Sequence, residues 1–271
     1  MNQQTRIKKL ALNSAIEAGD LILKKYRKFD RGTIRFKSKH EIVTEADIIA
    51  NKKILAAVQK DFPGHRILSE ESGDSKADSD YTWIVDPLDG TTNFSMHNPL
   101  WSVSIGITYK KEPLLGVVYA PFLGELYVAE QGKGAKIIDP ATGKSKKMSV
   151  SSMDQKSGLH AFCHGHDRES KQRALKYYNY QKEHGFDCRQ LGSAAIELAY
   201  VASGRIESIT IPGTNSWDVV AGVLMVREAG GKATDMDNKK WTLDSHDIAA
   251  SNGKLHPALI KAFKESGAKN F

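Results

Sequence analysis

Two aspartates three positions apart, Asp86 and Asp89, follow an apolar run in the stretch WIVDPLDGTTNF, residues 83–94. Asp-Pro and Asp-Gly pairs are typical of turns, because the aspartate side chain hydrogen-bonds nearby backbone while proline and glycine favour turn conformations. The alternative is that residues 83–85 form a buried strand whose end presents both carboxylates to one point, with the amides of the following glycine and threonines just beyond. Such a site would bind a cation and an anion together. This stretch alone leaves both interpretations open.

Further carboxylates occupy comparable positions elsewhere in the chain. Glu70 follows a short strand-like run much as Asp86 does, so two strand ends carry acid groups. Asp218 follows a serine and a tryptophan where a helix begins, and the helix dipole favours an acid in the first turn. Asp47 fits a capping box with Thr44. Each acid also has a simpler interpretation, as part of an exposed loop, a turn, a helix start or a cap.

Several familiar sites are excluded by what surrounds them. Residues 143–145 (Gly-Lys-Ser) resemble the end of a phosphate-binding P-loop, but the glycine required earlier is replaced by Ile138. Cys163, His164 and His166 lack the second half of a zinc-binding pattern, so we interpret them as a loop after a strand that is placed to touch a substrate. The chain contains neither a G-x-S-x-G nor an H-E-x-x-H motif.

Taken together, the acidic motifs resemble the inositol monophosphatase family of magnesium-dependent, lithium-sensitive phosphatases. The first family signature is similar to WIVDPLDGTTNF, and the second to WDVVAGVLMVREAGG, residues 217–231. Further similarity lies in FKSKHEIVTEAD (36–47), ILSEESG (67–73) and RQLGSAAIELAYVASGR (189–205). Their order and spacing hold over nearly the whole chain. The T-T-N-F ending resembles the inositol monophosphatase branch more than the nucleotide-phosphatase or bisphosphatase branches.

The resemblance implies a metal site built from oxygen ligands. It assigns one Mg²⁺ to Glu70, Asp86 and the Leu88 carbonyl, and a second to Asp86, Asp89 and Asp218, while a third and weaker ion shares Glu70. Oxygen ligands suit Mg²⁺ rather than zinc or copper. Four crowded carboxylates would repel one another without cations, so two to three ions per site are expected.

The resemblance also implies the catalytic groups. Thr91 and Asp47 orient and deprotonate the attacking water, and Glu70 contributes to catalysis through its metal. The amides of Gly90, Thr91 and Thr92 bind the phosphate oxygens where a short helix begins. The expected reaction is therefore hydrolysis of a phosphate monoester.

The leaving-group side departs from the family pattern. Relatives that prefer inositol phosphates commonly carry a glutamate seven residues before the second-signature aspartate, where this chain has Ile211. The loop in which relatives often have G-F-P reads C-H-G-H at 163–166. Inositol 1-phosphate is therefore only the default substrate, and fructose 1,6-bisphosphate or another sugar or nucleotide phosphate is the alternative. The candidate substrate contacts are Asp89, Asp167, Ser193, Ala195, Ile211 and Asp218.

Hydrophobic periodicity predicts the elements that position these residues. An amphipathic helix is expected from Ile7 to Phe29 and a second from Thr44 to Pro63, followed by an antiparallel meander over 101–138. Strands and helices then alternate to the end of the chain, which indicates layered sheets and helices. We expect an α/β fold, the family's five-layer α-β-α-β-α sandwich, with two closely packed halves, 1–140 and 141–271.

The composition of the chain indicates its cellular compartment and limits the kinds of partner it can bind. Two distant cysteines, no signal-like segment and no membrane-length apolar run indicate a cytoplasmic protein with no membrane partner. Residues 1–40 contain 11 basic and 3 acidic residues, whereas the remainder is nearly neutral. Such a segment can attract nucleic acid, but lysines on an amphipathic helix are usually its solvated face. The expected partners are a small-molecule phosphate monoester and, by the resemblance, a second copy in a homodimer; a regulatory role in binding RNA or protein is the non-enzymatic rival.

Overall fold

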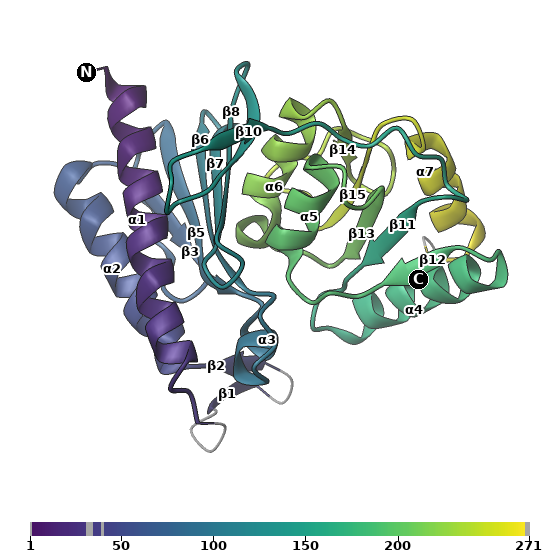
Figure 1. Ribbon diagram of the computed structural model, residues 1–271, viewed down its shortest axis with the longest axis horizontal. Coiled ribbons are helices and arrows are strands. Elements are labelled where there is room, and N and C mark those ends of the chain that lie inside the picture. The colour runs from purple at the N-terminus through teal and green to yellow at the C-terminus, as the bar shows by residue number, and fades with distance from the viewer. Residues whose placement is uncertain (1, 31–34, 39–40, 269–271) are drawn as a thin grey trace.

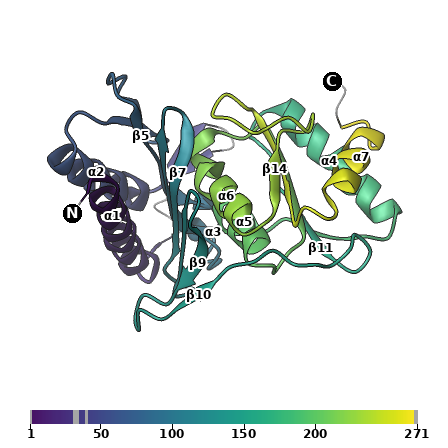
Figure 2. The ribbon, with the colours of Figure 1, turned by 90° about the horizontal axis from the view of Figure 1, so that it is seen from above.

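A computed structural model of the chain describes residues 2–30, 35–38 and 41–268. Helices and sheets alternate in five layers (Figure 1). The helices of this part of the chain are α1 (Gln3–Tyr26), α2 (Glu45–Asp61), α3 (Thr91–Ser95), α4 (Arg168–Glu183), α5 (Ala194–Ala202), α6 (Ser216–Glu228) and α7 (His256–Glu265). Helices α1 and α2 form one outer layer, α5 and α6 the middle layer, and α4 and α7 the other outer layer, as Figure 2 also shows from above. The predicted α-β-α-β-α sandwich is confirmed.

The first sheet has the strand order β10-β9-β8-β7-β6-β5-β3-β4. Its strands are β3 (Arg66–Ser69), β4 (Gly73–Asp74), β5 (Tyr81–Asp89), β6 (Ser102–Tyr109), β7 (Glu112–Ala120), β8 (Glu125–Glu130), β9 (Gly134–Ile138) and β10 (Ser145–Lys147). Strands β5 to β10 form the expected antiparallel meander, and β3 pairs parallel to β5. A separate hairpin is formed by β1 (Arg35–Ser38) and β2 (Glu41–Val43).

The second sheet has the strand order β12-β11-β13-β15-β14. Its strands are β11 (Leu159–Phe162), β12 (Asp187–Arg189), β13 (Ser208–Pro212), β14 (Lys232–Thr234) and β15 (Asp247–Ser251). Strand β11 runs parallel to both β12 and β13, while β15 is antiparallel to both β13 and β14. Short strands that alternate with helices therefore produce a mixed sheet, as the pattern in the second half predicts.

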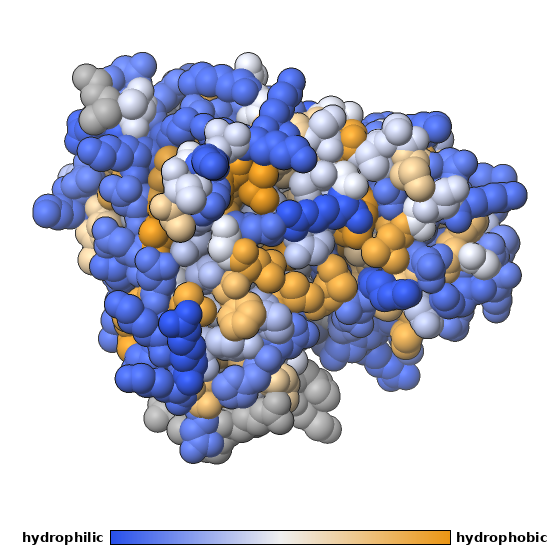
Figure 3. Space-filling view, viewed as in Figure 1, coloured by the Kyte–Doolittle hydropathy of each residue, from blue (hydrophilic) through white to orange (hydrophobic). Residues whose placement is uncertain are grey.

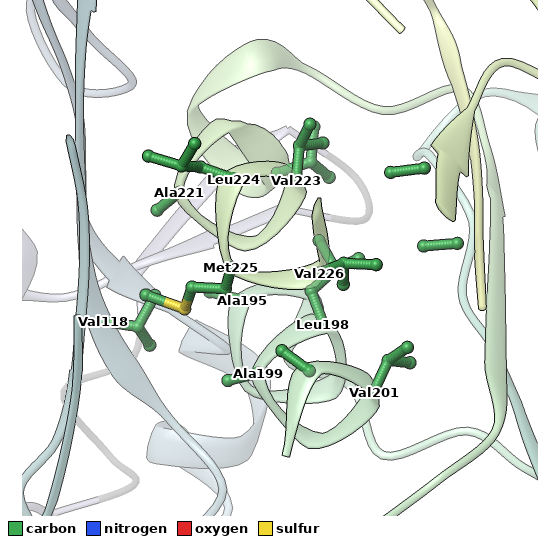
Figure 4. Packing of buried hydrophobic residues seen from close by; sticks show 14 of the residues in the cluster. Val118, Ala195, Leu198, Ala199, Val201, Ala221, Val223, Leu224, Met225 and Val226 are labelled. Carbon is green, nitrogen blue, oxygen red and sulfur yellow. The ribbon is translucent and has the colours of Figure 1, made fainter. Parts of the chain in front are cut away.

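Apolar clusters fill the spaces between the layers. The predicted stripe of α1, including Ile7, Ala11 and Ile22, is buried against α2 and the first sheet. On the other face of that sheet, Val118 of β7 faces Met225 of α6 (Figure 4). The surface over α1 and α2 is mainly hydrophilic in Figure 3. None of the helices within the described residues has the length and apolar character needed to cross a membrane.

An irregularity in β5 sets the direction of the two aspartates. Strand β5 pairs with β6 as Asp86↔Ser104 and Asp89↔Ser102. An advance of three residues along β5 therefore corresponds to an advance of two residues along β6. This is the count of a β-bulge, which inserts one extra residue into a strand. In a regular strand, residues three apart point to opposite faces. With the bulge, Leu88 joins the apolar cluster under α1 and α2, and both aspartates are directed to the middle helical layer.

Candidate active site

Glu70 and Asp86 emerge side by side because β3 and β5 are parallel and in register. Ser69 is paired with Val85, and the Glu70 amide donates to the Val85 carbonyl over 3.1 Å. The next residue of each strand therefore lies at the same edge of the sheet. Burial, followed by the nearby negative charge of Glu70, raises the pKa of Asp86 well above its usual range.

Asp89 is held by the start of α5. The amides of Ala194 and Ala195 donate to its carboxylate over 3.1 and 3.2 Å, and the Ser193 hydroxyl also donates to it. Burial raises the pKa of Asp89 to about 6, while these hydrogen bonds act in the opposite direction. Asp89 thus connects the first sheet to the middle layer of helices.

Asp218 reaches the same region from the start of α6. Its Oδ2 accepts the Asn215 amide over 2.9 Å and the Thr214 hydroxyl over 3.4 Å, which completes a capping box. Burial raises the pKa of Asp218 to about 7, and the charges of Asp89 and Glu70 add to the rise. The sequence-predicted ligands Glu70, Asp86, Asp89 and Asp218 are therefore brought together, although they come from three different elements, the end of β3, strand β5 and the start of α6.

Thr91 and Asp47 meet across the site. The Thr91 Oγ1 lies 3.2 Å from Asp47 Oδ1 and 2.9 Å from the Leu88 carbonyl oxygen, so the hydroxyl can donate to either. The other carboxylate oxygen of Asp47 accepts the amide and hydroxyl of Thr44 over 2.8 and 2.6 Å, as predicted for the capping box. Burial raises the pKa of Asp47 to about 6.

Gly90 makes the turn that leads from β5 into α3. Its φ is +84°, and a Cβ there would lie 2.8 Å from the Leu100 carbonyl oxygen, so only glycine fits. The amides of Gly90, Thr91 and Thr92 come before the first helical hydrogen bond and are available to an anion. Available backbone amides and paired carboxylates thus occupy one turn.

A cavity of about 330 Å³ opens between these groups. Of the predicted leaving-group contacts, Ile211 lines it, whereas Ser193 and Ala195 are buried behind it and bind Asp89. Asp167 does not line the cavity, because its carboxylate caps α4 by accepting the Ser170 amide over 2.8 Å. The lining also includes Gln190, Gly192, Thr214 and Asn215, which the motifs did not indicate.

The comparisons with known proteins agree with this geometry. The model of the inositol monophosphatase family matches residues 3–268. This chain belongs to the inositol monophosphatase family. The Nus factor SuhB of Pasteurella multocida is 36% identical over 270 residues, covering 94% of this chain and 98% of that protein. The inositol-1-monophosphatase of Mesorhizobium japonicum is 35% identical and is matched over 94% of each chain. The inositol monophosphatase structure from Anabaena has a TM-score of 0.82 at 31% identity, with 97% of each chain covered.

Membership of the inositol monophosphatase family makes the chain a phosphatase. Its donor set fits a hard divalent cation, since all candidate ligands are oxygen atoms and the charges of Glu70 and Asp89 add to the burial that raises the pKa of both Asp86 and Asp218. Within the described residues, no three His, Cys, Asp or Glu side chains already surround one point at coordinating distance. Backbone amides hold one oxygen of Asp86 and of Asp218 and both oxygens of Asp89. The site therefore fits a divalent cation by the number of its carboxylates and by their oxygen chemistry.

The raised pKa values give a stability prediction. A carboxyl whose folded-state pKa exceeds its unfolded value of about 4 stabilises the fold at low pH and loses that contribution as pH rises through the folded pKa. For Asp218, the pH range over which this contribution is lost runs from about pH 4 to about pH 7. In excess chelator, we therefore expect Asp218→Asn to have a higher Tm than wild type near pH 8, by several °C at roughly 2–4 °C per kcal/mol, and a similar Tm near pH 4. Thermal unfolding monitored by circular dichroism measures this difference, and a gap independent of pH would contradict the prediction.

Proposed function

We propose that this chain is a Mg²⁺-dependent phosphomonoesterase that hydrolyses a small polyol or sugar phosphate, with inositol 1-phosphate as the default substrate. The observation that carries the proposal is the meeting, around one cavity, of four carboxylates, an amide-rich turn and the Thr91–Asp47 pair. Family membership supports it, because these phosphatases are in general metal-dependent. The enzymatic alternative on the same scaffold is fructose-1,6-bisphosphatase or another sugar or nucleotide phosphatase.

Five residues would hold the metal. Glu70, Asp86 and the Leu88 carbonyl would bind one Mg²⁺, and Asp86, Asp89 and Asp218 a second, with a third sharing Glu70. When bound, Mg²⁺ offsets the negative charge of these carboxylates and stabilises the charge that develops on the reacting phosphate. The chain binds the remaining phosphate oxygens with the amides of the turn at residues 90–92.

Thr91 and Asp47 move the proton. Because burial brings the pKa of Asp47 to about 6, this carboxylate is mostly ionised at neutral pH and still basic enough to accept a proton. The Thr91 hydroxyl, 3.2 Å away, can take a proton from the attacking water and pass its own to Asp47. The water oxygen then bonds to phosphorus as the bond from phosphorus to the ester oxygen breaks. The ester oxygen takes up a proton from solvent and leaves as the alcohol, while Asp47 returns its proton to solvent.

A phosphate-release screen tests the proposal. Purified protein is incubated with inositol 1-phosphate, fructose 1,6-bisphosphate, glycerol 2-phosphate, histidinol phosphate, nucleoside monophosphates and NADP, with Mg²⁺ or with excess chelator. We expect Mg²⁺-dependent release from one or more monoesters. Release that persists in chelator would contradict the metal requirement, and no release from any ester would contradict the proposed substrate class.

The leaving-group side of the cavity has an apolar wall and polar side chains. Ile211 is 3% exposed in β13, opposite Ile248 of β15. The His164 Nδ1 lies 2.8 Å from the Gly165 carbonyl oxygen, which can only accept, so this nitrogen carries a proton. In neutral His164 the Nε2 is therefore an acceptor, and it faces the Gln190 amide nitrogen at 3.5 Å. Acceptors for sugar hydroxyls are present, but no carboxylate stands at position 211.

Ile211→Glu is expected to raise the preference for inositol 1-phosphate over fructose 1,6-bisphosphate. A carboxylate lining the cavity can accept a hydrogen bond from a ring hydroxyl and repels a second phosphate. Hydrogen bonds to charged groups contribute about 1.5–3 kcal/mol, so the ratio of kcat/KM values should shift by roughly ten- to a hundredfold. Steady-state kinetics with both substrates measures the ratio.

Ile211→Gln is the matched control for charge, because it offers a hydrogen bond without a negative charge. We expect it to shift the ratio less than Ile211→Glu does. An unchanged ratio in folded, active Ile211→Glu would show that Ile211 acts only as core, and that substrate choice lies in the loop 163–166.

The name of one relative and the positive charge of the first 40 residues together suggest a second candidate function, the binding of RNA. The relative from Pasteurella multocida is called Nus factor SuhB, and the first 40 residues of this chain are strongly basic. However, Lys8 pairs with Glu130 and Lys25 pairs with Glu45, which reduces the charge available to a polyanion. Retention on immobilised RNA over a salt series tests this candidate, since phosphate contacts produce a steep salt dependence.

The family resemblance also supports a homodimer, which analytical ultracentrifugation tests.

A further inference from the structure

Glu197 is a buried acid in an otherwise apolar helix. It lies in α5, its side chain is fully inaccessible, and its Oε1 accepts the Leu191 amide over 2.9 Å. Burial raises the pKa of Glu197 to about 8, while the amides of Leu191, Ser193 and Gly192 act in the opposite direction. The carboxyl group therefore folds back onto the turn that leads into its own helix, which we call the 191–193 turn.

The 191–193 turn packs against residues 90–92, the phosphate-binding turn. The Asn93 Nδ2 of α3 donates to the Leu191 carbonyl over 2.8 Å and to the Leu100 carbonyl over 2.7 Å. Gly192 has a φ of +81°, and a Cβ there would lie 3.2 Å from the Asn93 Nδ2. Its carbonyl oxygen would in turn lie 3.3 Å from a Cβ at Gly90. The two turns are thus packed backbone to backbone.

One residue, Leu191, therefore links two elements. Its amide donates to Glu197 in the middle helical layer, while its carbonyl accepts from Asn93 beside the phosphate-binding amides. The residues that follow soon after it, Ser193 to Ala195, are those that hold the carboxylate of Asp89. A shift of the 191–193 turn would move the supports of Asp89 and the wall behind Gly90 together.

We propose that Glu197 is a positioning residue that acts through the backbone of Leu191 and the side chain of Asn93. These contacts fix the start of α5 against the phosphate-binding turn and so set the orientation of Asp89. This inference rests on the proposed function in so far as Asp89 is a metal ligand. Glu197 does not itself line the cavity. Its effect on catalysis is therefore indirect.

The test compares Glu197→Ala and Glu197→Gln, with inositol 1-phosphate or the best ester of the screen as substrate. Outer-shell partners of metal ligands typically contribute about 10- to 100-fold to affinity or activity, and we expect a loss of this size in kcat and in Mg²⁺ affinity for Glu197→Ala. Glutamine keeps an oxygen that accepts the Leu191 amide, so Glu197→Gln should recover most of the loss. Calorimetric titration of substrate-free protein with Mg²⁺ supplies the readout that does not depend on turnover.

Glu207→Ala is the matched control. Glu207 is also buried and accepts a backbone amide, that of Leu159 over 2.5 Å, but it precedes β13 at the end away from the cavity. We expect Glu207→Ala to lower the Tm and to leave kcat and Mg²⁺ affinity unchanged. A purely structural role for Glu197 would give the same result for both alanine variants.

Asn93→Ala completes a double-mutant cycle with Glu197→Ala or, if that variant does not fold, with Glu197→Asp, whose shorter side chain draws the carboxylate away from the Leu191 amide. Residues that act through one residue, Leu191, should show effects that are less than additive. Unchanged Mg²⁺ affinity and kcat in folded Glu197→Ala, or strictly additive effects in the cycle, would overturn the inference. Absence of activity in wild type would instead overturn the proposed function, while the Mg²⁺ titration would still decide the role of Glu197.

Discussion

Asp86→Asn is expected to abolish turnover while leaving the protein folded. Asp86 is the carboxylate that both proposed Mg²⁺ sites share, and its buried side chain lies beside Glu70. Asparagine keeps the shape and can still accept the Leu88 amide that now binds Asp86 Oδ1 over 2.9 Å. It supplies no negative charge, so we expect a loss in kcat/KM above about 100-fold, the upper end for residues that only support a metal ligand.

Asp139→Asn provides the comparison for this result. Asp139 also accepts backbone amides, but in an exposed turn between β9 and β10. We expect it to retain wild-type kcat/KM. Phosphate release and the circular dichroism spectrum are measured for both variants, and substantial turnover by folded Asp86→Asn would contradict the shared-ligand proposal.

Thr91→Ala is expected to reduce kcat by about 10²- to 10⁴-fold, the usual contribution of general acid–base assistance. The substitution removes the hydroxyl that lies 3.2 Å from Asp47 Oδ1, but it keeps the backbone amide proposed to bind phosphate. KM should therefore change little. The separation of a large kcat effect from a small KM effect is the mark of a group that acts mainly in the transition state.

Thr91→Ser tests whether the hydroxyl is responsible. Serine retains the oxygen and its proton, so we expect kcat within about tenfold of wild type, a free-energy difference below about 1.4 kcal/mol. If Thr91→Ala turned over as fast as wild type, the proton would have to leave the attacking water by a route that does not include Thr91.

The periodic elements and the acidic motifs could be predicted from the sequence, because each leaves a local signal. The stripe of α1, the meander and the capping box at Asp47 are all found where the pattern indicates. The bulge in β5 could not be predicted, since a turn and a bulged strand share the same proline and aspartates. It is nevertheless the bulge that directs Asp86 and Asp89 to one side.

Residues on the leaving-group side show why side-chain roles were harder to predict. Asp167 is predicted as a substrate contact because it follows the loop 163–166 on the leaving-group side. However, an aspartate before a helix also caps it, and that local hydrogen bond is the one observed. Ser193 was expected at the substrate and instead binds Asp89. Glu197 did leave a signal, a single acid within the apolar helix AAIELAYVA, which indicates a buried partner without identifying it.

The position of Asp89 between two layers couples catalysis to the integrity of the fold. Its backbone belongs to the first sheet, whereas its carboxylate receives the amides of Ala194 and Ala195 from the middle layer. Deuterium uptake at these two amides should therefore follow separation of the layers rather than fraying of α5 alone. A partly unfolded molecule in which the layers have parted has no assembled catalytic centre, so a chain that is misassembled or still being synthesised cannot hydrolyse cellular phosphate esters before its two sheets have docked.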